Sequence, residues 1–482
     1  MASIPEQRMD DAMIADPATL SATELIAHYR RKKLSPVEAT QAVLDRIERF
    51  DGAVNAFCVV DPERALESAR ASEDRWRRGA PAGLVDGVPA TIKDVVLTAG
   101  WPTRRGSRAV ARDQPWDEDA PATARLREQG AVLIGKTTTP EFGWKAVTDS
   151  PLTGITRNPW DVAKTPGGSS GGAAAACALG LGVLHVGTDG GGSIRIPASF
   201  TGIFGLKPSF GRVPAWPLSP FGTVAHLGPM TRTVADAALM LNVLALPDAR
   251  DWHALPYDPR DYRIGLEDGV RGVRIAFSRN LGYAEVDPEV ADVVASAAAA
   301  FAELGAHVEE ADPGFADPRA IFVAHWYAGA ASILRHYGEH QRAEMDKGLV
   351  EIATEGASIK LPDYLDTVAQ RGALGQHMRA FHERFDLLLT PSVPIAAFAA
   401  GVERADPARQ ERWFDWASFS HPFNLTQQPA ASVPCGFTAT GLPVGLQIVG
   451  PMHADALVLR AARAFEAARP WPVPDAPRGS AD

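Results

Sequence analysis

Hydrophobic and polar positions follow a helical period over some stretches of this chain and a strand-like pattern over others. Residues 21–24 (SATE) and 35–38 (SPVE) match the capping box, a serine followed three positions later by glutamate, and both open amphipathic runs. They predict helices that begin at these serines. Residues 84–96 and 131–136 are apolar and rich in β-branched side chains, which predicts strands. Because helices and strands alternate along the whole length, we expect an α/β layered fold.

The same reasoning assigns the remaining elements and the extent of the domain. Further helices are predicted over residues 61–77, 122–128, 173–179, 235–246, 290–304 and 456–467. Further strands are predicted over residues 183–186, 273–277, 307–309, 385–389, 431–434 and 445–449. Neither an internal repeat nor an interdomain linker interrupts the pattern. We therefore expect one large domain over residues 15–470, with flexible tails at 1–14 and 471–482.

Composition narrows the class of protein. The chain has 482 residues, of which 46% are hydrophobic and 22% charged, values typical of a globular protein with ample core. A net charge of −10 argues against a nucleic-acid-binding surface. Cys58, Cys177 and Cys435 are widely spaced and odd in number, which favours free thiols in a reducing cytoplasm over a disulfide framework or a zinc site. No apolar run is long enough to span a bilayer, so we expect a cytoplasmic protein without a membrane partner.

The segment between residues 164 and 197 carries the strongest indication of chemistry. Two glycine-flanked serine loops, 167–172 (GGSSGG) and 190–193 (GGGS), bracket one apolar stretch. Glycine lets other groups approach the backbone closely, and such loops are suited to hold a nucleophile beside a row of N–H donors. A flexible linker would have polar flanks, whereas GGSSGG runs directly into AAAACALGLGVLHVG, which must be buried.

Ser193 is the candidate nucleophile because it lies on a sharp glycine turn directly after a strand-like run. Four consecutive N–H groups are expected to converge there as an oxyanion hole, those of Gly190, Gly191, Gly192 and Ser193. Loss of one such donor can cost about 3 kcal/mol. A capping serine in a phosphate loop is the alternative, but that loop would require Gly-Lys-Ser or Gly-Lys-Thr. A dinucleotide loop would continue into a helix, which Pro197 argues against.

These motifs resemble the signature of the amidase signature family of serine hydrolases. The resemblance rests on GGSSGG, on GTDGGGSIRIP at 187–197 and on GLKPSFGRVP at 205–214, in that order. It extends from about residue 20 to the run GLPVGLQIVG that ends at Gly450, and it weakens between 248 and 386. The resemblance implies a single large domain with a mixed central sheet of about a dozen strands surrounded by helices.

The resemblance also implies how the serine is activated. Ser193 would be the nucleophile, Ser169 would pass its proton on, and Lys93 in the TIKD motif would be the base. The family holds the peptide bond before the bridging serine in the cis form, which here joins Gly168 to Ser169. A lysine in a strand is by itself more typical of a surface charge. Its pKa of about 10.4 must fall by about three units, equivalent to about 4 kcal/mol, before it is neutral near pH 7, and burial can supply that shift.

Other polar residues near the serine loops are expected to support the site. Thr188, Asp189 and Arg195 are interpreted as a buried network that holds the glycine turn. Ser170 is expected to bond the loop or a substrate atom. None of the twelve histidines has a recognisable nucleophile–base context, and His185 in its apolar strand is expected to be a core residue. The sequence contains no metal-ligand cluster or cofactor fingerprint, so we expect neither a metal nor a cofactor.

The resemblance implies hydrolysis of a small linear carboxylic amide through an acyl-enzyme, and it leaves the acyl group open. Aromatic residues at 325–327 and at Trp413, Phe414 and Trp416 are candidates for a pocket wall or for core. The main alternative is the glutaminase component of the glutamyl-tRNA(Gln) amidotransferase, which releases ammonia from glutamine inside a complex. Glutamine would require a fixed acid and a fixed arginine, and the sequence identifies no such pair.

Two further alternatives remain at this stage. The family includes specialised hydrolases that cleave cyclic amides, urea derivatives or aryl acylamides, and the signature does not separate these from a linear amidase. A binding or scaffold protein without catalysis would have lost a member of the relay, whereas all three members are present. The oligomeric state stays open between a monomer and a homodimer.

Overall fold

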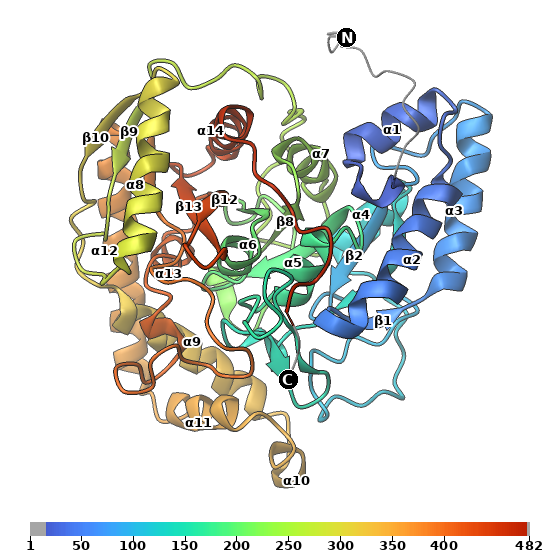
Figure 1. Cartoon of the computed structure of the whole chain (residues 1–482). Coiled ribbons are helices and arrows are strands. Elements are labelled where there is room, and N and C mark those ends of the chain that lie inside the picture. The colour runs from blue at the N-terminus through green and yellow to red at the C-terminus, as the bar shows by residue number, and fades with distance from the viewer. Residues whose placement is uncertain (1–15, 480–482) are drawn as a thin grey trace.

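A mixed sheet runs through the centre of the molecule, with helices on both of its faces (Figure 1). The computed structural model describes residues 16–479, so the predicted tail at 1–14 and the last three residues of the predicted tail at 471–482 lie outside the described residues. Eleven strands pair in the order β1-β3-β2-β6-β8-β7-β12-β13-β11-β9-β10. This arrangement confirms the expected fold, one large domain around a mixed central sheet.

The bounds of the elements are as follows. The strands of the central sheet are β1 (Phe57–Val60), β2 (Pro89–Lys93), β3 (Val132–Thr137), β6 (Leu184–Asp189), β7 (Phe204–Lys207), β8 (His226–Thr231), β9 (Arg274–Phe277), β10 (His307–Glu310), β11 (Leu387–Pro391), β12 (Ala430–Phe437) and β13 (Pro443–Val449). A separate pair is formed by β4 (Asp149–Ser150) and β5 (Gly154–Ile155). The α-helices are α1 (Ala22–Arg30), α2 (Pro36–Val54), α3 (Pro62–Arg77), α4 (Pro121–Glu128), α5 (Gly171–Ala178), α6 (Arg195–Thr201), α7 (Val234–Leu244), α8 (Pro288–Glu303), α9 (Arg319–Leu334), α10 (Glu339–Arg342), α11 (Lys347–Gly356), α12 (Leu361–Arg384), α13 (His421–Leu425) and α14 (Asp455–Ala468).

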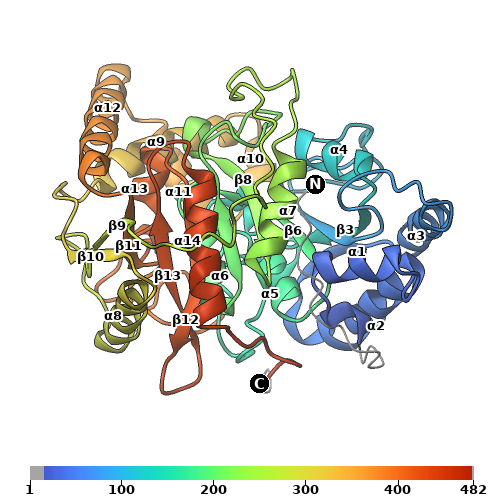
Figure 2. The ribbon, with the colours of Figure 1, turned by 90° about the horizontal axis from the view of Figure 1, so that it is seen from above.

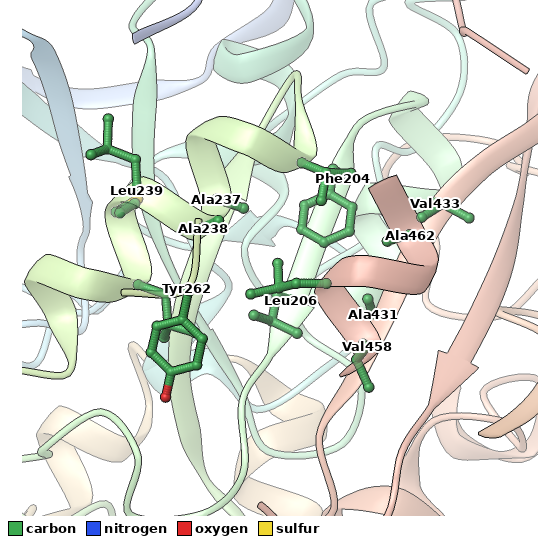
Figure 3. Packing of buried hydrophobic residues seen from close by; sticks show 14 of the residues in the cluster. Phe204, Leu206, Ala237, Ala238, Leu239, Tyr262, Ala431, Val433, Val458 and Ala462 are labelled. Carbon is green, nitrogen blue, oxygen red and sulfur yellow. The ribbon is translucent and has the colours of Figure 1, made fainter. Parts of the chain in front are cut away.

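Alternate side chains of the central strands enter different apolar clusters on the two faces of the sheet. In β3, Leu133 packs in the cluster that contains α1, α4, α7, α8 and α14, whereas Val132 and Ile134 pack with α2, α3 and α5. Phe204 and Leu206 of β7 lie beneath α7 and α14 (Figure 3), two helices that run side by side over the sheet (Figure 2). Because both faces are covered, most strands are apolar throughout, as in the sheets of α/β proteins.

The central sheet brings the strand that carries Lys93 and the segment with the two serine loops to the same edge. β2 and β6 are neighbouring parallel strands, so their carboxyl ends meet at the same edge of the sheet. Because Ile92 pairs with Val186, Lys93 at the end of β2 lies near Thr188. The helix α5, made of small residues, leads the GGSSGG loop into β6. An added Cβ at Gly172 would lie 2.5 Å from the backbone N of Thr138, so no larger residue fits at this position of the helix.

The structure corrects one expectation about the glycine turn. α6 (Arg195–Thr201) begins two residues after Ser193, whereas Pro197 was expected to prevent a helix at this position. Pro197 lies in the first turn of α6, where a backbone N–H has no partner within the helix. The turn is therefore a strand-to-helix connection, and the argument from Pro197 against a dinucleotide loop does not hold.

The state of the cysteines and the membrane-spanning potential of the helices can be compared with the expectations from composition. Cys58, Cys177 and Cys435 are free thiols, as predicted, and Cys177 is fully buried. Within the part of the chain that the structure describes, no helix has both the length and the apolar character needed to cross a membrane.

The C-terminal segment 471–479, expected to be a flexible tail, lies against the body of the protein. The Trp471 indole donates a hydrogen bond to the carbonyl of Arg232 at 3.1 Å and packs on the main apolar cluster. The backbone N–H of Arg478 donates to the carbonyl of Pro159 at 3.0 Å. These contacts anchor the segment at two places after α14 ends.

A shortened chain tests this anchoring. A chain that ends at Pro470 should lose about 1–3 kcal/mol of unfolding free energy, because it lacks several hydrogen bonds and a partly buried tryptophan. Chemical denaturation followed by circular dichroism measures the change, with a chain that ends at Gly479 as the control that keeps these contacts. Superimposable unfolding curves for the two chains would mean that the segment contributes nothing and behaves as the expected tail.

Candidate active site

The amine of Lys93 lies within hydrogen-bond distance of three hydroxyl groups. Lys93 is fully buried, and its Nζ is 2.6 Å from Ser169 Oγ, 2.9 Å from Ser170 Oγ and 2.8 Å from Thr188 Oγ1. The amine comes from β2, the serines from the loop before α5, and the threonine from β6. The structure thus brings together three segments that are far apart in the sequence.

The surroundings of Lys93 favour its neutral form. Burial lowers the pKa of Lys93 well below its ordinary value, and the more distant charge of Asp189 opposes this only in part. Among residues 16–479, no carboxylate forms an ion pair with this amine. The Ser170 hydroxyl donates to the carbonyl of Thr188 at 3.1 Å, so it acts as an acceptor toward Lys93. A neutral amine that donates to Ser170 and Thr188 keeps its lone pair for the proton of Ser169.

Ser193 and Ser169 open into the same cavity. Ser193 is 5% and Ser169 2% exposed, and both line the cavity described below. No hydrogen bond joins their hydroxyl groups in this structure, but the backbone N–H of Ser170 donates to the Ser193 carbonyl at 3.1 Å and ties the two loops together. The Gly168–Ser169 peptide bond is cis, as the resemblance predicts.

The glycine turn offers three free N–H groups rather than four. The N–H of Gly192 donates to Asp189 Oδ1 at 2.8 Å, which removes it from the predicted oxyanion hole. Among the described residues, the N–H groups of Gly190, Gly191 and Ser193 have no acceptor. Gly192 has a φ of +120°, a backbone conformation that side chains of L-residues rarely adopt. Its role is therefore to shape the turn.

Aromatic side chains pack closely against the turn. An added Cβ at Gly191 would lie 2.6 Å from Phe322 and 2.9 Å from Trp413, and one at Gly190 would lie 2.9 Å from Trp326. Gly190 and Gly191 are therefore required for close packing, because a larger residue at either position would overlap an aromatic ring.

A buried ion pair fixes the turn, as predicted for Asp189 and Arg195. Two bonds of 2.9 Å join them, from Arg195 Nε to Oδ2 and from Nη2 to Oδ1. Burial alone would raise the pKa of the Asp189 carboxyl, but the guanidinium overrides it and holds that pKa well below its ordinary value. The guanidinium also donates to three groups that sequence reasoning missed, the Ser420 carbonyl, Asn424 Oδ1 and Gln447 Oε1. Gln447 is detectable in the sequence as a polar residue in the otherwise apolar run PVGLQIV.

The structure places Thr188 differently from the expectation and, of the two alternatives for Ser170, agrees with a bond to the loop. Thr188 was interpreted as holding loop amides, whereas its hydroxyl contacts the amine of Lys93 directly. Ser170 is fully buried and bonds Lys93 and the backbone of Thr188, so it does not face substrate. His185 is a core residue as predicted: it contacts Thr91 Oγ1 at 2.8 Å, and burial lowers its pKa to about 3.

A cavity of about 500 Å³ lies in front of the two serines. Most of its wall is apolar or aromatic, from Val95, Val96, Phe142, Phe210, Val213, Trp216, Pro217, Leu218, Pro220, Phe221, Leu227, Trp326, Ile333 and Tyr337. Its volume lies in the range of sites that bind small molecules. Among residues 16–479, no group of three or more histidine, cysteine or acidic side chains is arranged to hold a metal ion.

The aromatic candidates divide between wall and core. Trp326 lines the cavity and stacks on Phe221, with ring centroids 3.8 Å apart. Trp413, Phe414 and Trp416 belong to the buried cluster behind it. The interpretation as pocket wall therefore holds for Trp326, and the interpretation as core holds for Trp413, Phe414 and Trp416.

Comparison with known proteins shows the family of this chain. Residues 38–459 match the model of the family described as Amidase. An acylamidase of Rhodococcus erythropolis is 40% identical over 460 residues, covering 94% of this chain and 96% of that protein. A glutamyl-tRNA(Gln) amidotransferase component of Gloeobacter violaceus is 36% identical over 475 residues, covering 93% of this chain and 96% of that protein.

Solved structures give the same result. A bacterial aryl acylamidase of the amidase signature family superimposes with a TM-score of 0.87 at 34% identity, covering 94% of this chain and 96% of that one. The 6-aminohexanoate cyclic dimer hydrolase superimposes with a TM-score of 0.87 at 29% identity, covering 96% and 99%. The protein described here is a hydrolase of the amidase class. The chain belongs to the amidase signature family.

The close packing of the turn leads to a stability prediction. Gly191→Ala should lower the free energy of unfolding by about 1–3 kcal/mol, because its Cβ overlaps Phe322. Gly52→Ala in α2 is the matched control, since an added Cβ there meets nothing within 4 Å. Chemical denaturation compares the two variants with the parent protein. Equal stability of Gly191→Ala and the parent protein would show that the aromatic rings do not restrict the turn.

Proposed function

We propose that the protein works alone as an amidase and hydrolyses a small carboxylic amide to a carboxylate and ammonia or an amine. The observation that carries the proposal is the contact of 2.6 Å between the buried amine of Lys93 and Ser169 Oγ, at the floor of a cavity that Ser193 also lines. An amine kept neutral by burial is a base, and a base is what a serine nucleophile requires.

In the proposed acylation, Lys93 accepts the proton of Ser169 while Ser169 accepts the proton of Ser193. Ser193 Oγ forms a bond to the amide carbon, and the electron pair of the carbonyl moves onto its oxygen. The N–H groups of Gly190, Gly191 and Ser193 are the available donors to this oxyanion, in place of the four proposed from the sequence.

The tetrahedral intermediate then returns its electron pair to the carbonyl, and the carbon–nitrogen bond breaks. The proton held by Lys93 passes back through Ser169 to the leaving nitrogen, which departs as ammonia or an amine. Water enters, gives a proton to the same relay and attacks the acyl-enzyme. Collapse of the second intermediate returns that proton to Ser193 and releases the carboxylate. Thr188, Ser170, Asp189 and Arg195 act in this scheme as positioning residues, since each touches the relay or the turn.

The glutaminase alternative has less support from the cavity. Glutamine would need an available carboxylate for its ammonium group. The cavity wall includes Asp251, but its two carboxylate oxygens accept the backbone N–H groups of Ala215 and His253 at 2.8 and 2.9 Å. The largely aromatic wall fits an organic acyl or aryl group better than a zwitterion.

The purified chain tests the proposal directly. Without any partner protein it should release ammonia or aniline from neutral aliphatic amides, benzamides and anilides, and Ser193→Ala should lower that rate by at least about 10³-fold because it removes the nucleophile. Ser199→Ala is the matched control, a buried serine on α6 that does not line the cavity. Circular dichroism confirms that each variant is folded. Ammonia released only from glutamine, and only after partner proteins are added, would favour the glutaminase.

The protonation state of Lys93 gives a second prediction. The base acts only when neutral, so kcat/KM should fall as the pH drops through the pKa of Lys93 and should be level above it. Because burial lowers that pKa well below its ordinary value, this acid limb should lie well below pH 10. Lys93→Arg keeps its proton at every accessible pH and should be inactive throughout. An acid limb close to pH 10, or an active Lys93→Arg variant, would remove Lys93 from the role of base.

A further inference from the structure

Arg105 lies in the wall of the catalytic cavity with no partner for its charge. It lines the cavity and is partly exposed to it. Across residues 16–479, its guanidinium forms neither an ion pair nor a hydrogen bond with protein. The neighbouring Arg104 differs, because its guanidinium donates to the carbonyls of Val110 and Arg108.

The backbone holds Arg105 in place next to the relay. Arg105 has a φ of +56° and Phe142 a φ of +53°, a left-handed conformation that is uncommon for residues other than glycine. The N–H of Phe142 donates to the Arg105 carbonyl at 2.7 Å, so the two turns are joined. An added Cβ at Gly143, the next residue, would lie 3.3 Å from Ser169 Oγ. Unusual backbone conformations that the surroundings maintain cluster at functional sites.

None of the neighbouring charged groups that the structure describes forms a contact with this guanidinium. The carboxylate of Asp251 is occupied by two backbone N–H groups, as described above. Glu141, close in sequence to Phe142, accepts from Ser107 Oγ and from the backbone N–H of Asp346. Lys93 is neutral in the proposed mechanism, and burial lowers the pKa of His226 in the cavity wall well below its ordinary value. Arg105 is therefore a cavity-wall cation that no carboxylate of the described residues contacts, and the N–H donors of its guanidinium are available to a ligand.

We propose that Arg105 binds a carboxylate group carried by the substrate, so that the preferred substrates are amides bearing a carboxylate on an aromatic or aliphatic body. This inference rests on the proposed amidase function and specifies its substrate class. A guanidinium presents parallel N–H donors that match the two oxygens of a carboxylate. The apolar wall around it binds the body of the molecule, and the charge pair orients the amide toward Ser193.

Matched pairs of substrates separate the charge from the shape. The wild-type protein is assayed with 3- and 4-carbamoylbenzoate and with the neutral 3- and 4-methylbenzamides, which have a similar size. We expect a higher kcat/KM for at least one of the carboxylates, and we expect added salt to lower the rate for that carboxylate alone. Turnover of the methylbenzamides without turnover of either carboxylate would overturn the inference and leave the amidase proposal intact. Turnover of neither kind would count against the amidase function itself, and the inference would fall with it.

Variants of Arg105 test whether this residue binds the carboxylate of the substrate. Arg105→Gln should lower kcat/KM for the preferred carboxylate by about 10- to 100-fold, mainly through KM, and should leave the methylbenzamides within about twofold. Arg105→Lys, which keeps the charge, should restore part of the loss. Arg108→Gln removes an exposed arginine of the same loop that does not line the cavity, so it controls for net charge and should have no effect. An equal loss for charged and neutral substrates in Arg105→Gln would show a structural role and overturn the inference. If Arg105→Gln does not fold, the wild-type substrate pairs and their salt dependence decide.

Discussion

The chemistry of this site depends on a primary amine that is buried without a carboxylate beside it. The two acids nearest to Lys93 in sequence or in space are both paired with other cations. Asp94, the next residue of the chain, forms an ion pair with the buried Lys136 at 3.2 Å, and Asp189 is held by Arg195. If either acid paired with Lys93 instead, it would raise the pKa of the amine and keep the proton on it. Burial therefore dominates, and the hydroxyl groups around Nζ supply polar contacts without fixing a positive charge.

Much of this site was predictable because its signals are local. One short segment of the chain contains both the glycines around Ser169 and Ser193 and the two residues of the ion pair, Asp189 and Arg195. The resemblance added Lys93, which strand propensity alone would have assigned to the surface. The direct contacts of Ser170 and Thr188 with the amine were not predictable, since they depend on how closely β2, β6 and the loop before α5 approach one another. Side-chain direction across such a junction is a tertiary property.

The missed helices show where periodicity carries little information. α9 (RAIFVAHWYAGAASIL) is apolar or small on nearly every side, because it is enclosed by α11, α12 and α13, so no polar face marks it. α12 has the opposite problem, since only Leu374, Met378 and Phe381 of its long, polar sequence are buried. A helix is recognisable from sequence when one face is polar and exposed to solvent and the opposite face is apolar and buried. Neither helix meets that condition. The third case is Pro197, which is compatible with a helix because it occupies the first turn.

The same aromatic side chains contact both the cavity and the glycine turn that carries Ser193. Trp326 of α9 faces the cavity on one side and abuts Gly190 on the other, while Phe322, one turn earlier, abuts Gly191. Trp326 also donates a hydrogen bond from its indole to the Trp144 carbonyl at 2.9 Å, which fixes the ring. A change in α9 that widens the cavity therefore also removes support from the N–H donors at the turn. In the proposed mechanism the choice of acyl group and the stabilisation of the oxyanion are therefore not independent, because the same aromatic rings contact both the cavity and the turn.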